Sequence, residues 1–310
     1  MDDGSNIVVT SQSYVVGPQT PVALRVPSGT RVTLLCEDAS GGQIWEGQKE
    51  DLLDKERLFP VTGVVAIDGV EPGDAVGIEL LSITASTDVG TIWTRTGLGL
   101  LDEITFHVRN VGLAGLSLDW LQENIKVTSA LHVGTAGVLP RNPCLGKDLG
   151  GHGGNIDFKR FGVGATLWLA AQTPGGNVFV GDVHAAMGDG EVCGTGVEIS
   201  AAVDVRLSAL TSWSPRLPTV TAEGGAWLIG IGDSLEDALR QAVREAVRLV
   251  SEKKGCSAGD AYLAVSSLLI VQLCQVVNSS SSVAVTLSGG LSGLLGPDLG
   301  AQTTISRDEA

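Results

Sequence analysis

The sequence predicts a mainly β protein, with a sandwich- or barrel-like body and a C-terminal α/β segment that contains two helices. Short β-branched runs recur at intervals of roughly ten residues over the first two thirds of the chain. The 42 glycines, scattered among Val, Ile and Thr, indicate tight turns between those runs. After Gly232 the apolar spacing changes from alternation to a helical period.

The predicted strands of the body are short runs rich in Val, Ile and Thr, bounded by Gly and Pro. In chain order they cover residues 7–10, 22–26, 31–36, 61–67, 76–83, 166–170, 177–180 and 197–203. The Pro72-Gly73 pair is a strong turn signal before one of them. We divide the body into an N-terminal β domain, residues 1–110, and a β region that carries the candidate site, residues 111–205.

The C-terminal segment, residues 206–288, shows two helix starts. Each pairs a capping residue with a carboxylate three positions later: Asp233 with Glu236, and Ser257 with Asp260. The elements expected here are helices over 234–251 and 258–271, a strand over 283–287 and a flexible tail over 289–310. Gly255 is expected to end the first helix.

Charge and cysteine usage limit the possible partners. The formal charge of −15 argues against nucleic acid and against an anionic membrane surface, because binding phosphates needs clustered Lys and Arg. No uninterrupted apolar stretch is long enough to predict a membrane span. The five cysteines are odd in number, widely spaced and without a CxxC pair, which disfavours a disulfide framework. We therefore expect a soluble protein in a reducing, cytoplasmic setting.

Two of the four histidines, His152 and His184, lie in glycine-dense, carboxylate-rich segments. On a strand, Asp182 and His184 would point to the same face, about 7 Å apart at Cα, and could hold one cation. Carboxylate and neutral imidazole are ligands expected of Zn²⁺ or a similar divalent ion. Asp189 and Glu191 repeat the spacing. The alternative stays open, because Gly-Asp-Gly is also a common turn in which the Asp side chain caps the backbone.

Residues 181–193 (GDVHAAMGDGEVC) resemble a signature of the acetamidase/formamidase family. Residues 152–157 (HGGNID) are similar to a second block of that family, upstream of the first. Further similar blocks occur in the same order at 38–44, 60–63, 69–74, 260–262 and 274–278. One departure is at Ile270 and Gln272, where the resemblance leads us to expect a charged pair. The similarity covers residues 7–287.

The resemblance implies hydrolysis of short linear amides, such as formamide or acetamide, to ammonia and a carboxylate. It also implies a bound divalent metal and a homo-oligomer, a dimer or higher. The polar residues of the matched blocks are Asp38, Asn155, Asp157, Asp182, His184, Asp189 and Glu191, with Glu198 just beyond them.

We therefore predict a metal-dependent amidase whose partner is a small linear amide. The predicted metal ligands are Asp182, His184, Asp157, His152 and Asp38. The predicted catalytic residues are Glu191 as general base, Asn155, which would orient the amide, and Asp189; substrate contacts are expected from Glu198 and His132. The ion is expected to be zinc, with calcium or another divalent ion as the alternative.

Two rival hypotheses remain. The chain could be a catalytically silent homologue that binds a small molecule or a metal. It could also be an acyl-transfer enzyme with Cys193 or Thr195 as nucleophile. The sequence favours the metal hypothesis over the second rival, because Cys193 has no base beside it in the chain.

Overall fold

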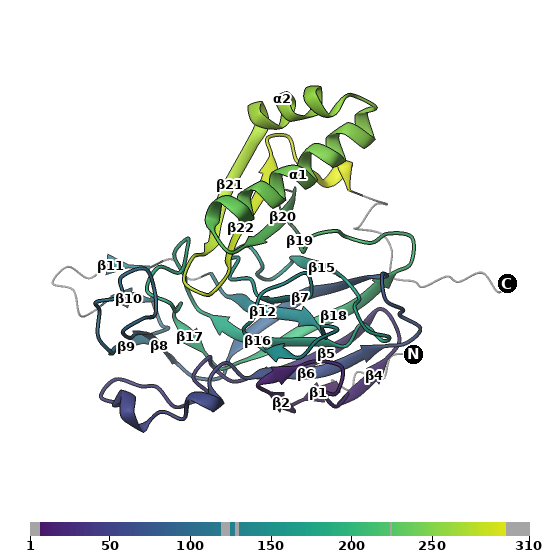
Figure 1. Ribbon diagram of the computed structural model, residues 1–310. Helices are drawn as coiled ribbons and strands as arrows, with labels where there is room; N and C mark the ends of the chain where they lie inside the picture. Colours follow the sequence, from purple (N-terminus) through teal and green to yellow (C-terminus); the bar gives the residue numbers. More distant parts are fainter. Residues whose placement is uncertain (1–6, 119–124, 128–129, 224, 296–310) are drawn as a thin grey trace.

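The computed structural model describes residues 7–118, 125–127, 130–223 and 225–295. Its body consists of two stacked β-sheets, and the two helices stand at one end of it (Figure 1). The predicted class, mainly β with a C-terminal α/β segment containing two helices, is confirmed. Among the described strands both sheets have free edges, so the body is a sandwich and not a closed barrel. Residues 296–310 of the predicted tail lie outside the described part.

The first sheet contains nine strands. In spatial order they are β1 (Ile7–Val9), β5 (Thr30–Cys36), β18 (Ala201–Leu210), β7 (Ala75–Ala85), β15 (Thr166–Ala170), β19 (Thr219–Ala222), β20 (Gly225–Gly232), β22 (Ser281–Leu287) and β21 (Leu269–Gln275). Strand β21 is thus an edge strand.

The second sheet runs in the order β14 (Gly153–Asn155), β12 (His132–Val138), β16 (Val178–His184), β17 (Glu198–Ile199), β8 (Val89–Thr94) and β9 (His107–Gly112). Strand β6 (Val61–Ile67) also pairs with β16, and it pairs with β2 (Gln12–Ser13) and β4 (Leu24–Val26). The remaining short elements are the pairs β10 (Ser117–Leu118) with β11 (Ile125–Lys126) and β3 (Val15–Val16) with β13 (Cys144–Leu145), and three 3-10 turns at Glu50–Leu52, Lys55–Arg57 and Ser292–Leu294.

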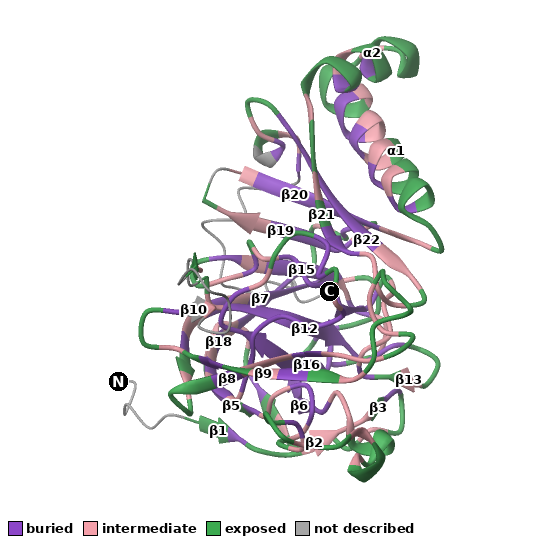
Figure 2. Cartoon of the chain, turned by 90° about the vertical axis from the view of Figure 1, so that its left-hand side faces the viewer, coloured by how far each residue is buried: buried purple, intermediate pink, exposed green. Residues whose placement is uncertain are grey.

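The core lies between the two sheets. Leu34 and Val203 from the first sheet and Val65 and Val180 from the second belong to one buried apolar cluster. Burying each such side chain contributes about 1.5–3 kcal/mol relative to leaving it exposed. Figure 2 shows the consequence, because the central strands of both sheets are buried while most of α2 and the surface loops are exposed.

The run predicted as one strand over 197–203 is in fact the crossing between the layers. Its first part is β17 in the second sheet, and after Ser200 it continues as β18 in the first sheet. This crossing places Glu198 beside β16. Both sheets contain strands from residues 1–110 and from residues 111–205, and the division of the chain at residue 110 stays a prediction.

Helix α1 (Leu235–Lys254) covers β20 and β22, as Figure 1 shows. Its small residues Ala238, Ala242 and Ala246 are fully buried against those strands. Gly255 ends it in a left-handed conformation, as predicted. The start differs from the prediction: Ser234 is the capping residue, and its hydroxyl accepts a hydrogen bond from the Asp237 amide at 3.1 Å.

Helix α2 (Ala258–Leu268) is shorter than predicted. Residues 269–271 were expected to continue the helix, and that expectation is wrong, because they begin β21 and pair with β22. Ladder hydrogen bonds to a neighbouring strand override a local apolar pattern that fits either element. None of the described helices is long and apolar enough to span a bilayer.

Candidate metal and catalytic site

Adjacent strands of the second sheet carry most of the predicted polar residues. The register sets His132 of β12 opposite His184 of β16, and His184 opposite Glu198 of β17. On the other side of β12, Thr135 is opposite Asn155 of β14. Residues from distant parts of the chain thus become direct neighbours across the strands.

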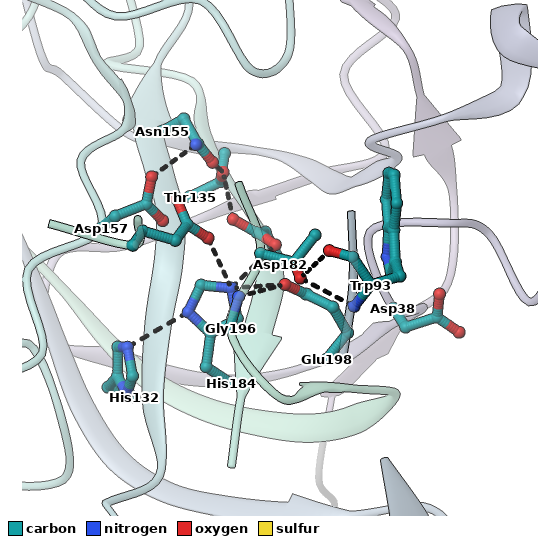
Figure 3. A network of polar contacts seen from close by, with 12 residues as sticks. Asp38, Trp93, His132, Thr135, Asn155, Asp157, Asp182, His184, Gly196 and Glu198 are labelled. Carbon is teal, nitrogen blue, oxygen red and sulfur yellow. Dashed lines mark hydrogen bonds and ion pairs between the residues drawn. The ribbon is translucent and has the colours of Figure 1, made fainter. Parts of the chain in front are cut away.

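His184 is the centre of this cluster, as Figure 3 shows. Its Nε2 atom lies 3.1 Å from Glu198 Oε1 and 3.2 Å from Asp182 Oδ1. The same atom lies 3.8 Å from Glu191 Oε1. All four side chains are at least 95% buried. One ring nitrogen therefore faces three carboxyl groups away from solvent.

The other ring nitrogen of His184 is held by His132. The Nδ1 atom of His132 lies 2.7 Å from the Ala130 carbonyl oxygen, so it carries a proton and donates it there. Burial, together with the neighbouring His184, lowers the pKa of His132 to about 3, so its ring is neutral. Its Nε2 atom then accepts from His184 Nδ1 at 3.1 Å. When His184 is neutral, this bond leaves the lone pair of its Nε2 atom facing the carboxyl groups.

A second network holds Asp157 beside this group. Asn155 donates from its Nδ2 atom to Asp157 Oδ2, and its own Oδ1 atom accepts from the Thr135 hydroxyl. The Thr135 hydroxyl also lies 3.2 Å from Asp182 Oδ2. Both ends of the Asn155 amide are therefore used to orient other site residues (Figure 3).

Three of the Asp and Glu residues in the cluster have a left-handed backbone conformation, which residues other than glycine rarely adopt. The φ angle is 52° at Asp157, 55° at Asp182 and 52° at Glu191. Such conformations cost free energy and persist only where the surroundings impose them, typically at functional sites. Among the described residues, three of the six non-glycine residues with positive φ are thus carboxylate residues beside His184.

Without a cation, three carboxyl groups of the site have raised pKa values. Burial raises the pKa of Glu191 and of Glu198 to about 8. Burial, with the nearby Glu191 and Asp182, holds the pKa of Asp157 well above its usual range. Glu191 and Glu198 are therefore mostly protonated at neutral pH.

Asp182 and His184 form the one charged pair in this cluster. Burial opposes ionisation of Asp182, but the charge of His184 and several hydrogen bonds outweigh it, and the pKa of Asp182 is lowered. Burial also opposes the charge on His184, but Glu198 and Asp182 outweigh it and hold the pKa of His184 well above its usual value. The Asp182 carboxylate and the His184 imidazolium thus stabilise each other.

The absence of a side chain at Gly134 leaves room for Asp157, Asp182 and His184. A Cβ atom at Gly134 would lie 2.5 Å from Asp182 Oδ2 and 2.6 Å from Asp157 Oδ1, closer than real Cβ contacts allow. At Gly196 a Cβ atom would meet the His184 ring at 2.8 Å. Both glycines are required because the backbone approaches the cluster closely.

The arrangement fits a divalent cation. Two sets of ligand-type atoms lie within 4.8 Å of one another: Asp157, His184 and Glu191, and Asp182, His184 and Glu198. Among the described atoms, Asp157 Oδ1 and Glu198 Oε2 are buried without a hydrogen-bond partner. Unpartnered buried oxygens are costly, and coordination to a cation would satisfy them.

Three predicted residues lie apart from this cluster. The Asp38 carboxylate caps the Ser40 amide at 2.8 Å and lies beyond Trp93 in Figure 3. His152 is buried, and its Nε2 atom lies 3.7 Å from Cys144 Sγ. Asp189 is exposed and pairs with Lys159. Their predicted roles stay predictions that these contacts do not support.

The sequence prediction missed Thr135 and Gly134, and it left Cys193 as a rival nucleophile. In the structure the Cys193 thiol contacts only Thr195 among the described polar groups, and the Thr195 hydroxyl donates to the Trp93 carbonyl. No base lies beside this thiol within the described residues. Thr135 could have been found only from its strand partner, because its local sequence shows no functional pattern.

Fold and site together define a two-sheet β protein with a buried carboxylate–histidine site suited to a divalent cation. The model of the acetamidase/formamidase family matches residues 149–218, which hold most of that site. The resemblance seen in the sequence is thereby confirmed.

Solved structures of proteins named acetamidase are similar to this chain over most of its length. The acetamidase from Yersinia enterocolitica is 27% identical, with 91% of this chain and 92% of that one covered and a TM-score of 0.85. The acetamidase from Bacillus halodurans is 25% identical, with coverages of 90% and 96% and a TM-score of 0.85. A formamidase from Methylophilus methylotrophus is 21% identical over 261 residues. The match covers 62% of the length of the curated relatives, less than two thirds.

Proposed function

We propose that this chain hydrolyses short linear amides to ammonia and a carboxylate, with a divalent cation bound at His184. The observation that carries the proposal is the orientation of the His184 ring. Its Nδ1 atom is committed to His132, while its Nε2 atom faces three buried carboxyl groups. The family match and the similarity to proteins named acetamidase and formamidase support the reaction.

The residues proposed to hold the cation are Asp182, His184, Glu198, Glu191 and Asp157, in one or both of the two ligand sets. A mixture of imidazole and carboxylate suits zinc, and calcium or another divalent ion is the alternative. When bound, the cation supplies Lewis acidity that polarises the amide carbonyl and makes water easier to deprotonate. Binding would also replace the protons that Glu191 and Glu198 hold in the empty site.

Glu191 is the proposed general base. A bound cation would displace the proton that Glu191 carries when the site is empty, and this leaves the Glu191 carboxylate deprotonated and able to accept a proton. In the proposed reaction Glu191 accepts a proton from the attacking water and returns it to the leaving nitrogen. The new C–O bond forms first and the C–N bond then breaks, so the products are ammonia and the carboxylic acid, which loses its remaining proton to become the carboxylate.

Asn155 has a different proposed role from the one expected from the sequence. Both ends of its amide are bonded, to Thr135 and Asp157, so we assign it to the orientation of Asp157. Substrate size is limited by the burial of the cluster, in which His184 is fully buried and Glu198 is 2% exposed. Formamide and acetamide are the proposed substrates, and the similarity to proteins named formamidase and acetamidase supports them.

The test is ammonia release from formamide, acetamide and longer amides, with metal analysis of the same sample before and after chelation. The proposal expects turnover that decreases as the acyl chain lengthens, that chelation removes and that the divalent ion restores. Retained metal without turnover on any amide would support the silent homologue instead. Inactivation by thiol reagents with no loss on chelation would support acyl transfer through Cys193.

A further inference from the structure

Four side chains close a polar bridge over the turn that carries Glu191. Lys159 Nζ lies 2.8 Å from Asp189 Oδ1, and Gln272 Nε2 donates to the same oxygen at 2.9 Å. Arg160 Nε donates to Gln272 Oε1 at 2.9 Å. We call Lys159, Arg160, Asp189 and Gln272 the latch. It joins three segments: the loop after β14, the turn after β16 and edge strand β21.

The latch lies next to two of the facing carboxyl groups. Asp157 is two residues before Lys159, and Glu191 is two residues after Asp189. Asp157 and Glu191 belong to one ligand set with His184, and both have a left-handed backbone. Each therefore lies in a short turn, and contacts from neighbouring segments determine the position of that turn. The Lys159–Asp189 ion pair ties those two turns to each other.

Backbone hydrogen bonds tie the second turn to β21 as well. The Gly190 amide donates to the Cys274 carbonyl at 3.2 Å, and the Val276 amide donates to the Gly190 carbonyl at 3.1 Å. Gln272 adds a side-chain bond to the same turn, two residues before Cys274. The C-terminal α/β segment thus reaches the site through one edge strand.

Global stability is a poor explanation for the latch. The side chains of Lys159 and Asp189 are 36% and 47% exposed. Exposed ion pairs of this kind contribute little to folding stability, because solvent screens them and their side chains lose entropy. A weak interaction can still matter for positioning, because a displacement of about 1 Å at a site can reduce its activity strongly.

We propose that the latch positions Asp157 and Glu191 so that their carboxyl groups stay close enough to His184 to bind one cation together. Through Gln272, the C-terminal strand β21 then influences the affinity for that cation. This inference rests on the proposed function only in taking Asp157 and Glu191 as cation ligands. Asp189, predicted as a catalytic residue, is on this proposal a positioning residue that does not touch the substrate.

The test uses the full chain and the variants Asp189→Asn, Lys159→Met and Gln272→Ala. Amide hydrogen exchange over residues 188–194 reports the turn directly and needs neither metal nor activity. Zinc affinity is measured by chelator competition, and kcat and KM are measured on formamide. A matched control is Glu236→Gln, which breaks the exposed Arg240–Glu236 pair on α1.

The expected result is faster exchange over 188–194 in all three variants, with zinc affinity lower by about 10-fold and a lower kcat at similar KM. The melting temperature stays close to that of the wild type, and the Glu236→Gln control changes none of these values. The charge-reversed double variant Lys159→Asp/Asp189→Lys recovers part of the lost affinity, because it restores the ion pair but not the bond from Gln272 to residue 189.

Two results would overturn the latch: unchanged exchange in Asp189→Asn, or faster exchange with unchanged zinc affinity. Failure of the proposed function looks different, because the wild type would then bind no divalent cation and release no ammonia. Unchanged exchange in all three variants would still overturn the latch in that case, and faster exchange confined to them would still support the tie between the turns.

Discussion

The Nε2 atom of His132 lies 3.1 Å from the Nδ1 atom of His184, and the two rings are nearly perpendicular, at 71°. Because the Ala130 carbonyl takes the only proton of the neutral His132 ring, His132 can act only as an acceptor toward His184. This relationship fixes both the tautomer and the tilt of the candidate ligand.

Loss of His132 should therefore weaken cation binding without removing a ligand. The variant His132→Phe keeps a ring but loses the acceptor, and we expect zinc affinity to fall by about 10–100-fold, the usual cost of an outer-shell partner. Chelator competition measures this. His107→Phe, at an exposed position, is the control. Wild-type affinity in His132→Phe would contradict the assignment.

Removal of Asp182 should have a larger effect. Asp182→Asn loses the charge that faces His184 Nε2 at 3.2 Å. We expect the rate of ammonia release to fall by more than about 100-fold, because loss of a residue that only supports a ligand costs up to about that much. The amide keeps the size of the side chain, so circular dichroism should stay that of the wild type. Asp102→Asn, at an exposed carboxylate, should keep full activity. Undiminished turnover in Asp182→Asn would exclude Asp182 from the site.

Gly134→Ala tests the close approach of the backbone to the cluster. The added methyl group would lie 2.5 Å from Asp182 Oδ2, so we expect loss of metal binding and destabilisation by about 1–3 kcal/mol. Chemical denaturation and metal analysis measure the two effects. Gly112→Ala is a matched strand control, because its Cβ atom would meet nothing within 4 Å. Equal behaviour of both variants would refute the steric argument.

The metal-free protein should lose stability as the pH rises. Burial raises the pKa of Glu191 and Glu198 from 4.5 to about 8, so between these values the folded chain binds more protons than the unfolded chain. Their contribution to stability is complete below pH 4.5 and is lost as the pH rises through 8. The raised pKa of His184 acts in the same direction above pH 6.5. The lowered pKa of His132 acts oppositely between about 3 and 6.5, and that of Asp182 acts oppositely below 3.8, so the loss of stability should be clearest above pH 6.5.

Melting temperatures from pH 5 to 9 in a chelator test this dependence. Added zinc should reverse the slope, because cation binding needs the deprotonated carboxylates and displaces their protons. The double variant Glu191→Gln/Glu198→Gln should show a flatter curve in the chelator. An equally steep curve in that variant would show that other groups set the pH dependence.

Helix α1 offers a test of its starting residue. Ser234→Ala removes the acceptor of the Asp237 amide and should cost about 1 kcal/mol of unfolding free energy. Asp233→Ala is the control and should cost less, although the sequence pattern marks Asp233 as the cap. The opposite order in denaturant titrations would restore the sequence prediction.

Much of the secondary structure follows from local pattern. The runs at 61–67 and 166–170 are the strands β6 and β15 without change, and Gly255 ends α1 as expected. Asp182 and His184 lie together in β16, as their spacing predicts, with Asp182 Oδ1 3.2 Å from His184 Nε2. The helix predicted over residues 269–271 was wrong, because a short apolar run fits either a helix or a strand and only its pairing with β22 decides between them.

The sequence by itself determined the β class, the two capped helices and the Asp182–His184 pair, because turn chemistry and side-chain period act over a few residues. Only the tertiary structure decided which groups surround that pair. Strand pairing brings His132 beside His184 across 52 residues, and the latch brings Asp189 to Gln272 across 83. No local period encodes such contacts, because strand register and layer crossing fix them.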